Sequence, residues 1–494
     1  MRKHIPIFFS ALMLTGVNLL LRLFGTGFQV YLSGQIGAEG IGLLQLTLSA
    51  GSMAMVAGMG GIRTATMYLS AEELGKNRPK NIPSVLAACT FYSICFSLCI
   101  ATLLYVFAPF IGHYWIGNAG VTDSLRLFCV FLPVNCLCGV MIGYFTGANR
   151  IGTLAAIEVA EQIFSMVITV LLLKFYAKQN QEAACLCVVF GSGLGGCFTL
   201  LVLTLVRCRD KVDKSVQIPI TRRLLRTALP LAAADDLRTG ISTLENMMVP
   251  RRLALYPDTL TPLAAFGTVT GMVFPILMFP AAFLFGLTEL LVPELARCNA
   301  SGRTERIDHL VRKSMKSALI YGAVCAGVLY LTAPNLCMRF YGSSQAGEYL
   351  RWFSLLAIML YTDSVVDAMI KGLGQQSASV CFNIITNIMD VALLYVLLPI
   401  LGMKGYFISF LITHGINLIL SLWRLLKITH IRIHMRIPVF TLLVLLLSIA
   451  VASFCTNPWI ASLCFIAIFF CGLYVCAVIT MEDFNWIKGL LYKK

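Results

Sequence analysis

Charged residues are scarce in this chain. They make up 12% of the 494 residues, against about 25% in ordinary soluble domains, whereas hydrophobic residues make up 58%. Acidic residues are scarcer than basic ones, with 23 Asp and Glu against 38 Lys and Arg, which gives a net charge of +15. Most of the Lys and Arg lie in short loops between apolar segments, where they set membrane topology. The composition therefore predicts a polytopic membrane protein and does not indicate nucleic acid as a partner.

Several other signals are missing. No GxxxxGK[ST] motif occurs, and the two longest basic loops, Arg207–Thr227 and Arg297–Lys316, are too short for a nucleotide-binding domain, so we expect no ATP-binding domain in this chain. The 18 cysteines lie mostly inside apolar runs, as at Cys185 and Cys187, which predicts small buried hydrophobes and no metal site. Met1–Lys3 precede an apolar run without a small-residue cleavage pattern, which predicts a retained signal anchor.

Long apolar segments dominate what is present. A segment of about 20 apolar residues crosses a hydrocarbon core of about 30 Å. The fold class predicted is all-α, with about 14 transmembrane helices by this rule. The segment 228–250 is the least certain because it carries Asp235, Asp236, Arg238 and Glu245. The expected spans are Pro6–Leu32, Ile41–Leu69, Pro83–Pro109, Leu125–Thr146, Thr153–Lys174, Ala183–Val206, Ala228–Pro250, Leu263–Leu291, Ser317–Asn335, Trp352–Lys371, Ser379–Pro399, Gly405–Leu426, Pro438–Phe454 and Trp459–Thr480.

The basic residues are distributed unequally between the two sides of this arrangement. With the N-terminus inside, roughly 27 Lys and Arg fall on the cytoplasmic side, about 8 outside and about 3 within spans. The outer loops, such as Leu253–Pro262 and Phe340–Arg351, are short. We therefore predict a multi-pass protein of the cell membrane with cytoplasmic N- and C-termini. Met481–Lys494, with Trp486, is predicted to be an interfacial anchor.

A weak internal repeat accompanies the span pattern. Sliding the chain by 225 residues (147 to 372) places Gly147 on Gly372, and it places Glu158 on Asn383 and Gln162 on Asn387. Secondary transporters are commonly built from duplicated bundles. We expect a six-span lobe at 1–218, a second at 219–432 and a two-span tail at 433–494.

About the first 80 residues carry segments that resemble a known family. The segments NLLLRLFGTGFQVYLSGQIGAEGIGLLQL (18–46) and GIRTATMYLSAEELGKN (61–77) resemble the signature of the polysaccharide-flippase branch of the multidrug, oligosaccharidyl-lipid and polysaccharide exporter superfamily, nearest the stage V sporulation protein B group. The turns GANR at 147 and GLGQ at 372 add to the likeness. The resemblance implies two helical bundles around a central cavity that move a lipid-linked sugar by alternating access. The lipid II flippase, a cousin, carries a second Arg near Phe28 that this chain lacks.

Charged groups inside a membrane are costly and usually face a cavity or a partner. Arg22 lies in the middle of the first expected span and Arg63 near the inner end of the second. Two guanidinium forks suit a pyrophosphate, because each offers paired donors to phosphate oxygens. Alternatively, Arg22 pairs with Glu158 or Glu161, and Arg63 extends to the interface.

The span 153–174 carries the acids of the first half. Glu158 and Glu161 lie three residues apart on one helical face, with Gln162 beside them. These residues either accept hydrogen bonds from sugar hydroxyls or neutralise the two arginines. The predicted substrate site therefore comprises Arg22, Arg63, Glu158, Glu161 and Gln162.

The second half carries acids and amides that offer oxygen ligands for a hard cation such as sodium, or share protons. Asp236, Asp363, Asn387 and Asp390 are the predicted cation-binding residues, and no other cofactor is expected. Internal ion pairs with Arg238 and Lys371 are the alternative. His414, which could relay protons with Asn417, is interpreted as a hydrogen-bonded core histidine. The segment GSGLGG at 191–196 is interpreted as a site of close helix packing and not as a phosphate-binding loop.

Three functions fit these features. The first is a flippase for a lipid-linked oligosaccharide or a peptidoglycan precursor. The second is a cation-coupled multidrug exporter of the same fold, which the two arginines disfavour because they would repel cationic drugs. The third is a membrane glycosyl polymerase or ligase, which would need a catalytic residue in a sizeable outer loop and is disfavoured by the short loops.

Overall fold

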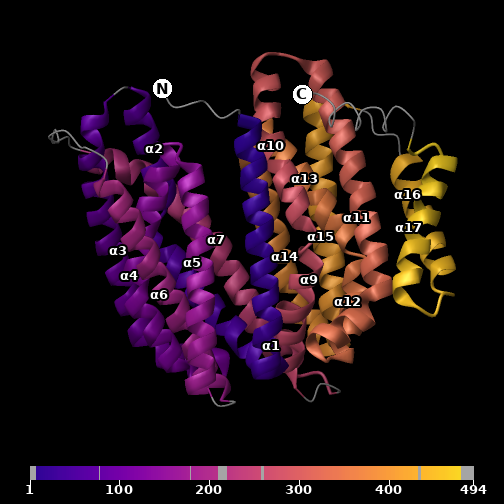
Figure 1. The fold of residues 1–494 in the computed structure, drawn as a ribbon, viewed down its shortest axis with the longest axis horizontal. Helices are drawn as coiled ribbons and strands as arrows, with labels where there is room; N and C mark the ends of the chain where they lie inside the picture. Colours follow the sequence, from indigo (N-terminus) through magenta and orange to yellow (C-terminus); the bar gives the residue numbers. More distant parts are fainter. Residues whose placement is uncertain are drawn as a thin grey trace. The chain divides into compact units, whose positions relative to one another are not determined.

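The computed structural model describes residues 7–76, 78–177, 180–209, 220–257, 261–431 and 436–479, with side chains from residue 16 onward. Within these ranges the regular structure is entirely helical (Figure 1). The predicted anchor Met481–Lys494 and the charged start Met1–Lys3 lie outside the described residues. The helices are α1 (Ile7–Met59), α2 (Ile62–Gly75), α3 (Ile82–Phe110), α4 (Val121–Gly147), α5 (Ile151–Leu172), α6 (Gln181–Cys208), α7 (Thr221–Leu253), α8 (Pro262–Thr268), α9 (Phe274–Met278), α10 (Ala281–Ala300), α11 (Thr304–Tyr341), α12 (Ser344–Ser354), α13 (Ala357–Gly372), α14 (Gln376–Leu401), α15 (Met403–Thr429), α16 (Arg436–Ala452) and α17 (Pro458–Val475).

The chain forms two compact units. The first comprises Met1–Gly271 with Val391–Gly402, and the second Met272–Asp390 with Met403–Lys494. In the first unit α7 packs against α1 and α2, and α8 packs against α1. These units are a different division from the lobes expected at 1–218, 219–432 and 433–494, and the lobe boundaries stay a prediction.

The number of membrane crossings is compatible with the expected fourteen. Among the described residues, nine helices are long and apolar enough to span a membrane, or up to eleven when each of two bent pairs is one span. The stretch Gly16–Gly75 is 60 residues long, and at 1.5 Å per residue it holds two crossings. Helix α7 is not counted because it carries too many charged residues, and α16 is not counted because its 17 residues are slightly too few.

Three expected spans are broken. The predicted span Leu263–Leu291 is bent by 58° between Pro262–Met278 and α10, where Pro280 interrupts the regular helical hydrogen bonds. Trp352–Lys371 is bent by 52° between α12 and α13. The third, Ile41–Leu69, ends as α1 at Met59 and resumes as α2.

Two glycines make the break between α1 and α2. Gly60 and Gly61 have φ angles of 49° and 69°, which glycine adopts without a side-chain clash. Gly61 also lies against α7, because a Cβ there would come 2.5 Å from the carbonyl oxygen of Ala228. The Tyr92 hydroxyl on α3 donates to the carbonyl oxygen of Gly60 at 3.1 Å. The break therefore lets α2 enter its packing site among α3, α4 and α7.

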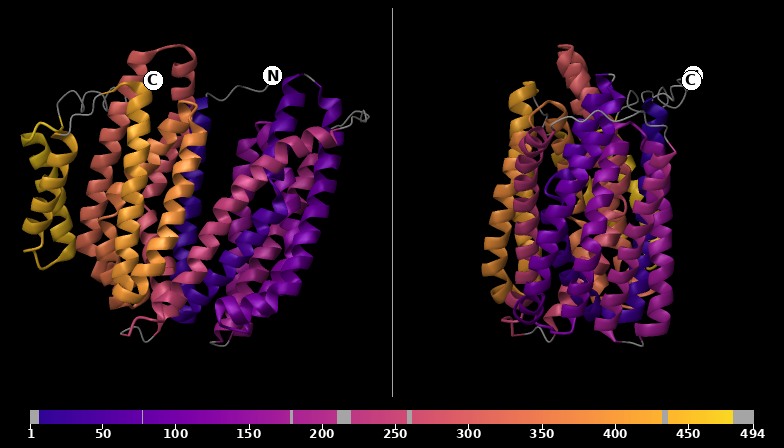
Figure 2. Two further views of the ribbon diagram at one scale, coloured as in Figure 1. Left: turned by 180° about the vertical axis from the view of Figure 1, so that it is seen from behind. Right: turned by 90° about the vertical axis from the view of Figure 1, so that its left-hand side faces the viewer.

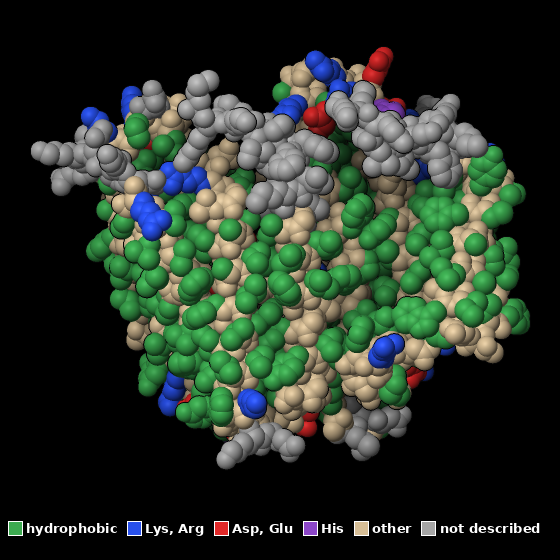
Figure 3. All heavy atoms as spheres, in the orientation of Figure 1, with side chains coloured by type: hydrophobic (Ala, Val, Ile, Leu, Met, Phe, Trp, Pro, Cys, Tyr) green, Lys and Arg blue, Asp and Glu red, His purple; other side chains and the backbone are tan. Residues whose placement is uncertain are grey.

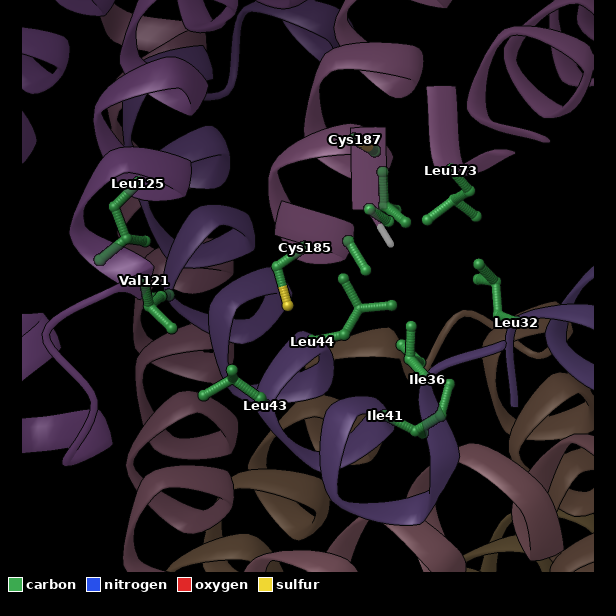
Figure 4. Packing of buried hydrophobic residues seen from close by; sticks show 14 of the residues in the cluster. Leu32, Ile36, Ile41, Leu43, Leu44, Val121, Leu125, Leu173, Cys185 and Cys187 are labelled. Atoms are coloured by element: carbon green, nitrogen blue, oxygen red, sulfur yellow. The ribbon is translucent and has the colours of Figure 1, made fainter. Parts of the chain in front are cut away.

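An apolar cluster surrounds the kink in α1 at Gly37. Leu32 and Ile36 before the kink and Leu44 after it pack with residues of α4 and α6, as Figure 4 shows. Cys185 and Cys187 of α6 belong to this cluster and are 0% and 3% exposed. The expectation that the cysteines of apolar runs are small buried hydrophobes is confirmed for this pair, whereas it is wrong for Cys95 and Cys99 of α3, which are exposed.

Glycines bring several helices of the first unit into close contact. A Cβ at Gly143 of α4 would lie 2.3 Å from the carbonyl oxygen of Arg63, and one at Gly147 would lie 2.6 Å from that of Met67. In α6, Cβ atoms at Gly191 and Gly193 would meet Thr169 and Phe131 at 2.1 and 2.2 Å. The segment 191–196 therefore serves helix packing, as expected.

In the second unit, α11 is the central helix, packed against α12, α13, α16 and α17. The C-terminal pair α16 and α17, drawn in yellow, packs against it (Figure 2). Figure 3 shows hydrophobic side chains over the middle of the visible face and Lys and Arg mainly toward the helix ends. This distribution fits helices that cross a bilayer.

Candidate functional site

The first unit holds all five residues of the predicted substrate site. Arg22 is part-exposed on α1, and α5 packs beside it. Gln162 of α5 donates its Nε2 to the carbonyl oxygen of Leu21 at 3.1 Å. The amide also packs over Gly25, one turn along α1, where a Cβ would make an ordinary contact of 3.4 Å with Gln162 Nε2. Gln162 therefore holds α5 against α1 immediately beside Arg22.

Arg63 is exposed and follows the Gly60–Gly61 break by two residues. Its backbone is held against α4 at Gly143, so the start of α2 has little freedom to shift. Its positive charge is close enough to act on the carboxylate of Glu158, which is half-buried on α5. The structure therefore places the charge of Arg63 within electrostatic range of Glu158.

The other acid of α5 is held by α6. Glu161 is half-buried and accepts a hydrogen bond from the Thr199 hydroxyl at 2.5 Å. Sequence reasoning missed Thr199, because a threonine in an apolar helix gives no signal of its own. Of the three polar side chains on this face of α5, Glu161 contacts α6, Gln162 contacts α1, and Glu158 lies within the electrostatic range of Arg63.

The predicted cation-binding residues fall in both units. Asp236, on α7, belongs to the first unit, whereas Asp363, Asn387 and Asp390 belong to the second. Asp236 is part-buried, and its Oδ1 has no hydrogen-bond partner among the described residues, whereas its neighbour Asp235 is exposed. Its charge acts on Tyr92, the residue that bonds to Gly60 at the helix break.

In the second unit Asp363 of α13 faces Asn417 of α15. The Asn417 Nδ2 donates to Asp363 Oδ2 at 2.8 Å. The remaining oxygens of both side chains, Asp363 Oδ1 and Asn417 Oδ1, are buried and have no hydrogen-bond partner within the described part of the chain. Two buried oxygens without donors suit a hard cation or an added proton. His414 lies three residues before Asn417 on α15, and its ring centroid lies 4.7 Å from that of Phe410.

The neighbouring acids have partners. Asp390 of α14 is 6% exposed and accepts from the hydroxyls of Ser409 at 2.6 Å and Thr413 at 3.2 Å. Asp367 pairs with Lys371 at 2.5 Å and accepts from the hydroxyl of Ser379. The internal ion pair considered for Lys371 therefore exists. Asn387 lies three residues before Asp390 and is part-exposed.

No group of three or more His, Cys, Asp or Glu side chains arranged to hold a metal ion occurs in the described ranges. The polar clusters of each unit instead combine one or two carboxylates with amides, hydroxyls or arginines inside apolar helices. Fold and clusters together define an all-α multi-pass membrane protein with polar groups inside its apolar helices.

Comparison with solved structures gives the fold. The inward-facing conformation of a multidrug resistance MATE family transporter of the MOP superfamily matches 84% of this chain and 98% of its own, with a TM-score of 0.67 and 15% identity. The lipid II flippase MurJ in its inward closed conformation matches 96% of this chain and 100% of its own, with a TM-score of 0.67 and 13% identity. The chain therefore has the fold of these transporters.

Comparison of sequences finds similarity to proteins of polysaccharide biosynthesis and sporulation. Residues 9–248 match the family described as polysaccharide biosynthesis protein. Stage V sporulation protein B of Bacillus subtilis (strain 168) is 21% identical over 408 residues, which cover 80% of this chain and 79% of that protein. The resemblance expected from the N-terminal segments is thereby confirmed. The relatives support a flippase or exporter and not an enzyme.

Proposed function

We propose that this chain is a flippase that moves a lipid-linked oligosaccharide or a peptidoglycan precursor across the cell membrane by alternating access. The observation that carries the proposal is the pair of arginines in the first unit, Arg22 and Arg63, which stand in apolar helices beside the polar face of α5. A pyrophosphate joins the lipid and sugar of such substrates, and guanidinium groups bind phosphate oxygens through paired hydrogen bonds.

The contacts of α5 divide the five predicted residues by role. Arg22 and Arg63 supply positive charge for the pyrophosphate. Gln162 and Glu161 are engaged with Leu21 and Thr199, so they position α5 and contribute less directly to the substrate. Glu158 balances the charge of Arg63 when no substrate is bound and accepts hydrogen bonds from sugar hydroxyls when one is.

A second proposal concerns the coupling ion. Asp363 and Asn417 are the residues that would hold a sodium ion or a proton, because each has one buried oxygen without a hydrogen-bond donor. Asp390 and Asn387 offer further oxygen ligands in the same unit, and the predicted role of Asp236 concerns the first unit separately. The membrane topology that accompanies this proposal places both termini in the cytoplasm.

The first test is reconstitution with a labelled lipid-linked sugar and measurement of its appearance in the outer leaflet. We expect Arg22→Ala to abolish transfer at normal membrane abundance and Arg22→Lys to restore only part of it, because an ammonium cannot reproduce the planar fork. Arg238→Ala, in the charged helix α7, is the matched control. Loss of folded protein in Arg22→Ala that is reversed by also removing Glu158 would show instead that Arg22 is structural.

The second test separates this reading from a cation-coupled multidrug exporter, which the MATE fold favours. Transport of a cationic dye and of the lipid-linked sugar are compared in sodium and in a large organic cation. A flippase transfers the sugar and not the dye. If sodium or protons drive transfer, Asp363→Asn removes that dependence, whereas Asp367→Asn, one turn further along α13 and already paired with Lys371, keeps it.

A further inference from the structure

A cavity of about 770 Å³ lies at the end of α11 in the second unit, and it is separate from every polar cluster described above. Four of its lining residues come from the last turns of α11 and four from the start of α17 and the loop before it. Its size is within the range of small-molecule sites, about 300–1,000 Å³. The lining residues are Asn335, Leu336, Arg339, Phe340, Thr456, Asn457, Pro458 and Trp459.

The walls of this α11–α17 cavity are of two kinds. Arg339, with two asparagine amides and a threonine hydroxyl, forms a cationic and hydrogen-bonding wall, and the remaining four residues are apolar. A site with one charged wall and one apolar wall fits a ligand that is itself amphipathic. Because the charged side chain is an arginine, the polar part of that ligand must be an anion.

Arg339 is available to such an anion. It is exposed, and among the described residues no carboxylate or hydrogen-bond acceptor pairs with it. Arg351 of the following helix, by contrast, stacks over the ring of Tyr330 at 4.5 Å. Asn457 uses its Oδ1 to cap α17 at the backbone N–H of Trp459, 3.0 Å away, which leaves its amide donors uncommitted by that bond.

The surroundings of the cavity belong to a membrane interface. Phe340 and Trp459 in the lining are 50% and 57% exposed, and Phe454 in the adjoining loop is 88% exposed. Large apolar side chains at the end of two apolar spans face lipid, and tryptophan is enriched at the level of the headgroups. The ligand that reaches this position in quantity is a membrane lipid.

We propose that the α11–α17 cavity binds an anionic phospholipid, with Arg339 on the headgroup phosphate and Trp459 and Phe340 beside the glycerol and the first part of the chains. Basic pockets between transmembrane helices bind anionic headgroups in this way. The expected topology puts the site in the outer leaflet. The lipid bridges α11 and α17, so it joins the C-terminal helix pair to the rest of the second unit.

The test uses the full chain in detergent micelles and the quenching of tryptophan fluorescence by lipids with brominated acyl chains. Brominated phosphatidylglycerol is titrated against brominated phosphatidylcholine, and Trp459→Phe identifies the fraction of the signal that comes from the cavity. We expect half-quenching of that fraction at a roughly tenfold lower content of the anionic lipid, because the choline ammonium of phosphatidylcholine neutralises the charge of its phosphate and repels Arg339.

Variants and a competitor decide the outcome. Arg339→Gln abolishes the preference for the anionic lipid, Arg339→Lys retains part of it, and Arg251→Gln, an exposed arginine in the last turn of α7, leaves it unchanged. Inorganic phosphate at millimolar concentration does not displace the lipid. Equal quenching by the two lipids in the unaltered protein overturns the proposal. So does full displacement by free phosphate, which would make the cavity a soluble-anion site.

Discussion

Arg223, at the start of α7, bridges two adjacent carboxylates at the end of α2, and its removal offers a quantitative test of how α2 is held. Its Nη1 lies 3.0 Å from Glu73 Oε1, and its Nη2 pairs with Glu72. The Glu73 side chain is 5% exposed and also accepts from Asn81 Nδ2 at 2.7 Å. Glu72 is 42% exposed and has a second cation, Lys76, at 2.5 Å.

We expect Arg223→Gln to destabilise the protein chiefly through Glu73. Removing one partner of a fully buried ion pair costs about 3–5 kcal/mol, and exposed pairs contribute about 0–1 kcal/mol. Arg223 is 40% exposed and Glu73 keeps Asn81, so we expect a loss of about 1–2 kcal/mol. In double-mutant cycles we expect a coupling energy of about 1 kcal/mol between Arg223 and Glu73, and one below about 0.5 kcal/mol between Arg223 and Glu72.

The assay is reversible unfolding in mixed micelles of the single and double variants Arg223→Gln, Glu73→Gln and Glu72→Gln. Arg222→Gln is the matched control, because Arg222 is the exposed neighbour in the same helical turn. The reasoning is refuted if Arg223→Gln costs no more than Arg222→Gln. A coupling to Glu72 larger than that to Glu73 would also refute it, since burial would then not set the strength of the pair.

Three further predictions follow from the contacts. Hydrogen bonds from Asn81 and then Arg223 lower the pKa of Glu73 from its ordinary value of 4.5, and hydrogen bonds from Lys76 and then Arg223 lower that of Glu72. The stability difference between the parent and Arg223→Gln is therefore full above pH 4.5 and shrinks as the pH falls below it. A difference that stays constant in acid contradicts this prediction. Gly143→Ala places a Cβ 2.3 Å from the carbonyl oxygen of Arg63 and costs about 1–3 kcal/mol in the same unfolding assay, whereas Gly27→Ala, with nothing within 4 Å, is tolerated. The third prediction uses a cysteine-free background and an impermeant thiol reagent added outside intact cells. A cysteine placed at Ser301, between α10 and α11, is protected from the reagent, whereas one placed at Thr456 reacts with it. The reverse pattern would show that the proposed topology is inverted.

The sequence alone determined the class of the molecule. Hydropathy is summed over about 20 neighbouring residues, so a membrane span can be read without knowing its partners. The buried state of Cys185 and the packing role of the glycines at 191–196 were also predictable, because small residues inside an apolar helix have few other uses. The likeness to a transporter family came from residues 18–46 and 61–77 and agrees with the matches of sequence and fold.

Only the tertiary structure decided which polar groups meet. Helical periodicity placed Glu161 and Gln162 on nearly one face of α5, yet their partners, Thr199 and the carbonyl oxygen of Leu21, lie 38 and 141 residues away in the chain. Asp363 likewise meets Asn417, 54 residues on. The period of a helix fixes the direction of a side chain relative to its own axis, but the helix that faces it depends on how all the spans pack together. The same packing, with positive φ angles at Gly60 and Gly61, breaks an apolar run that local composition predicted to be continuous.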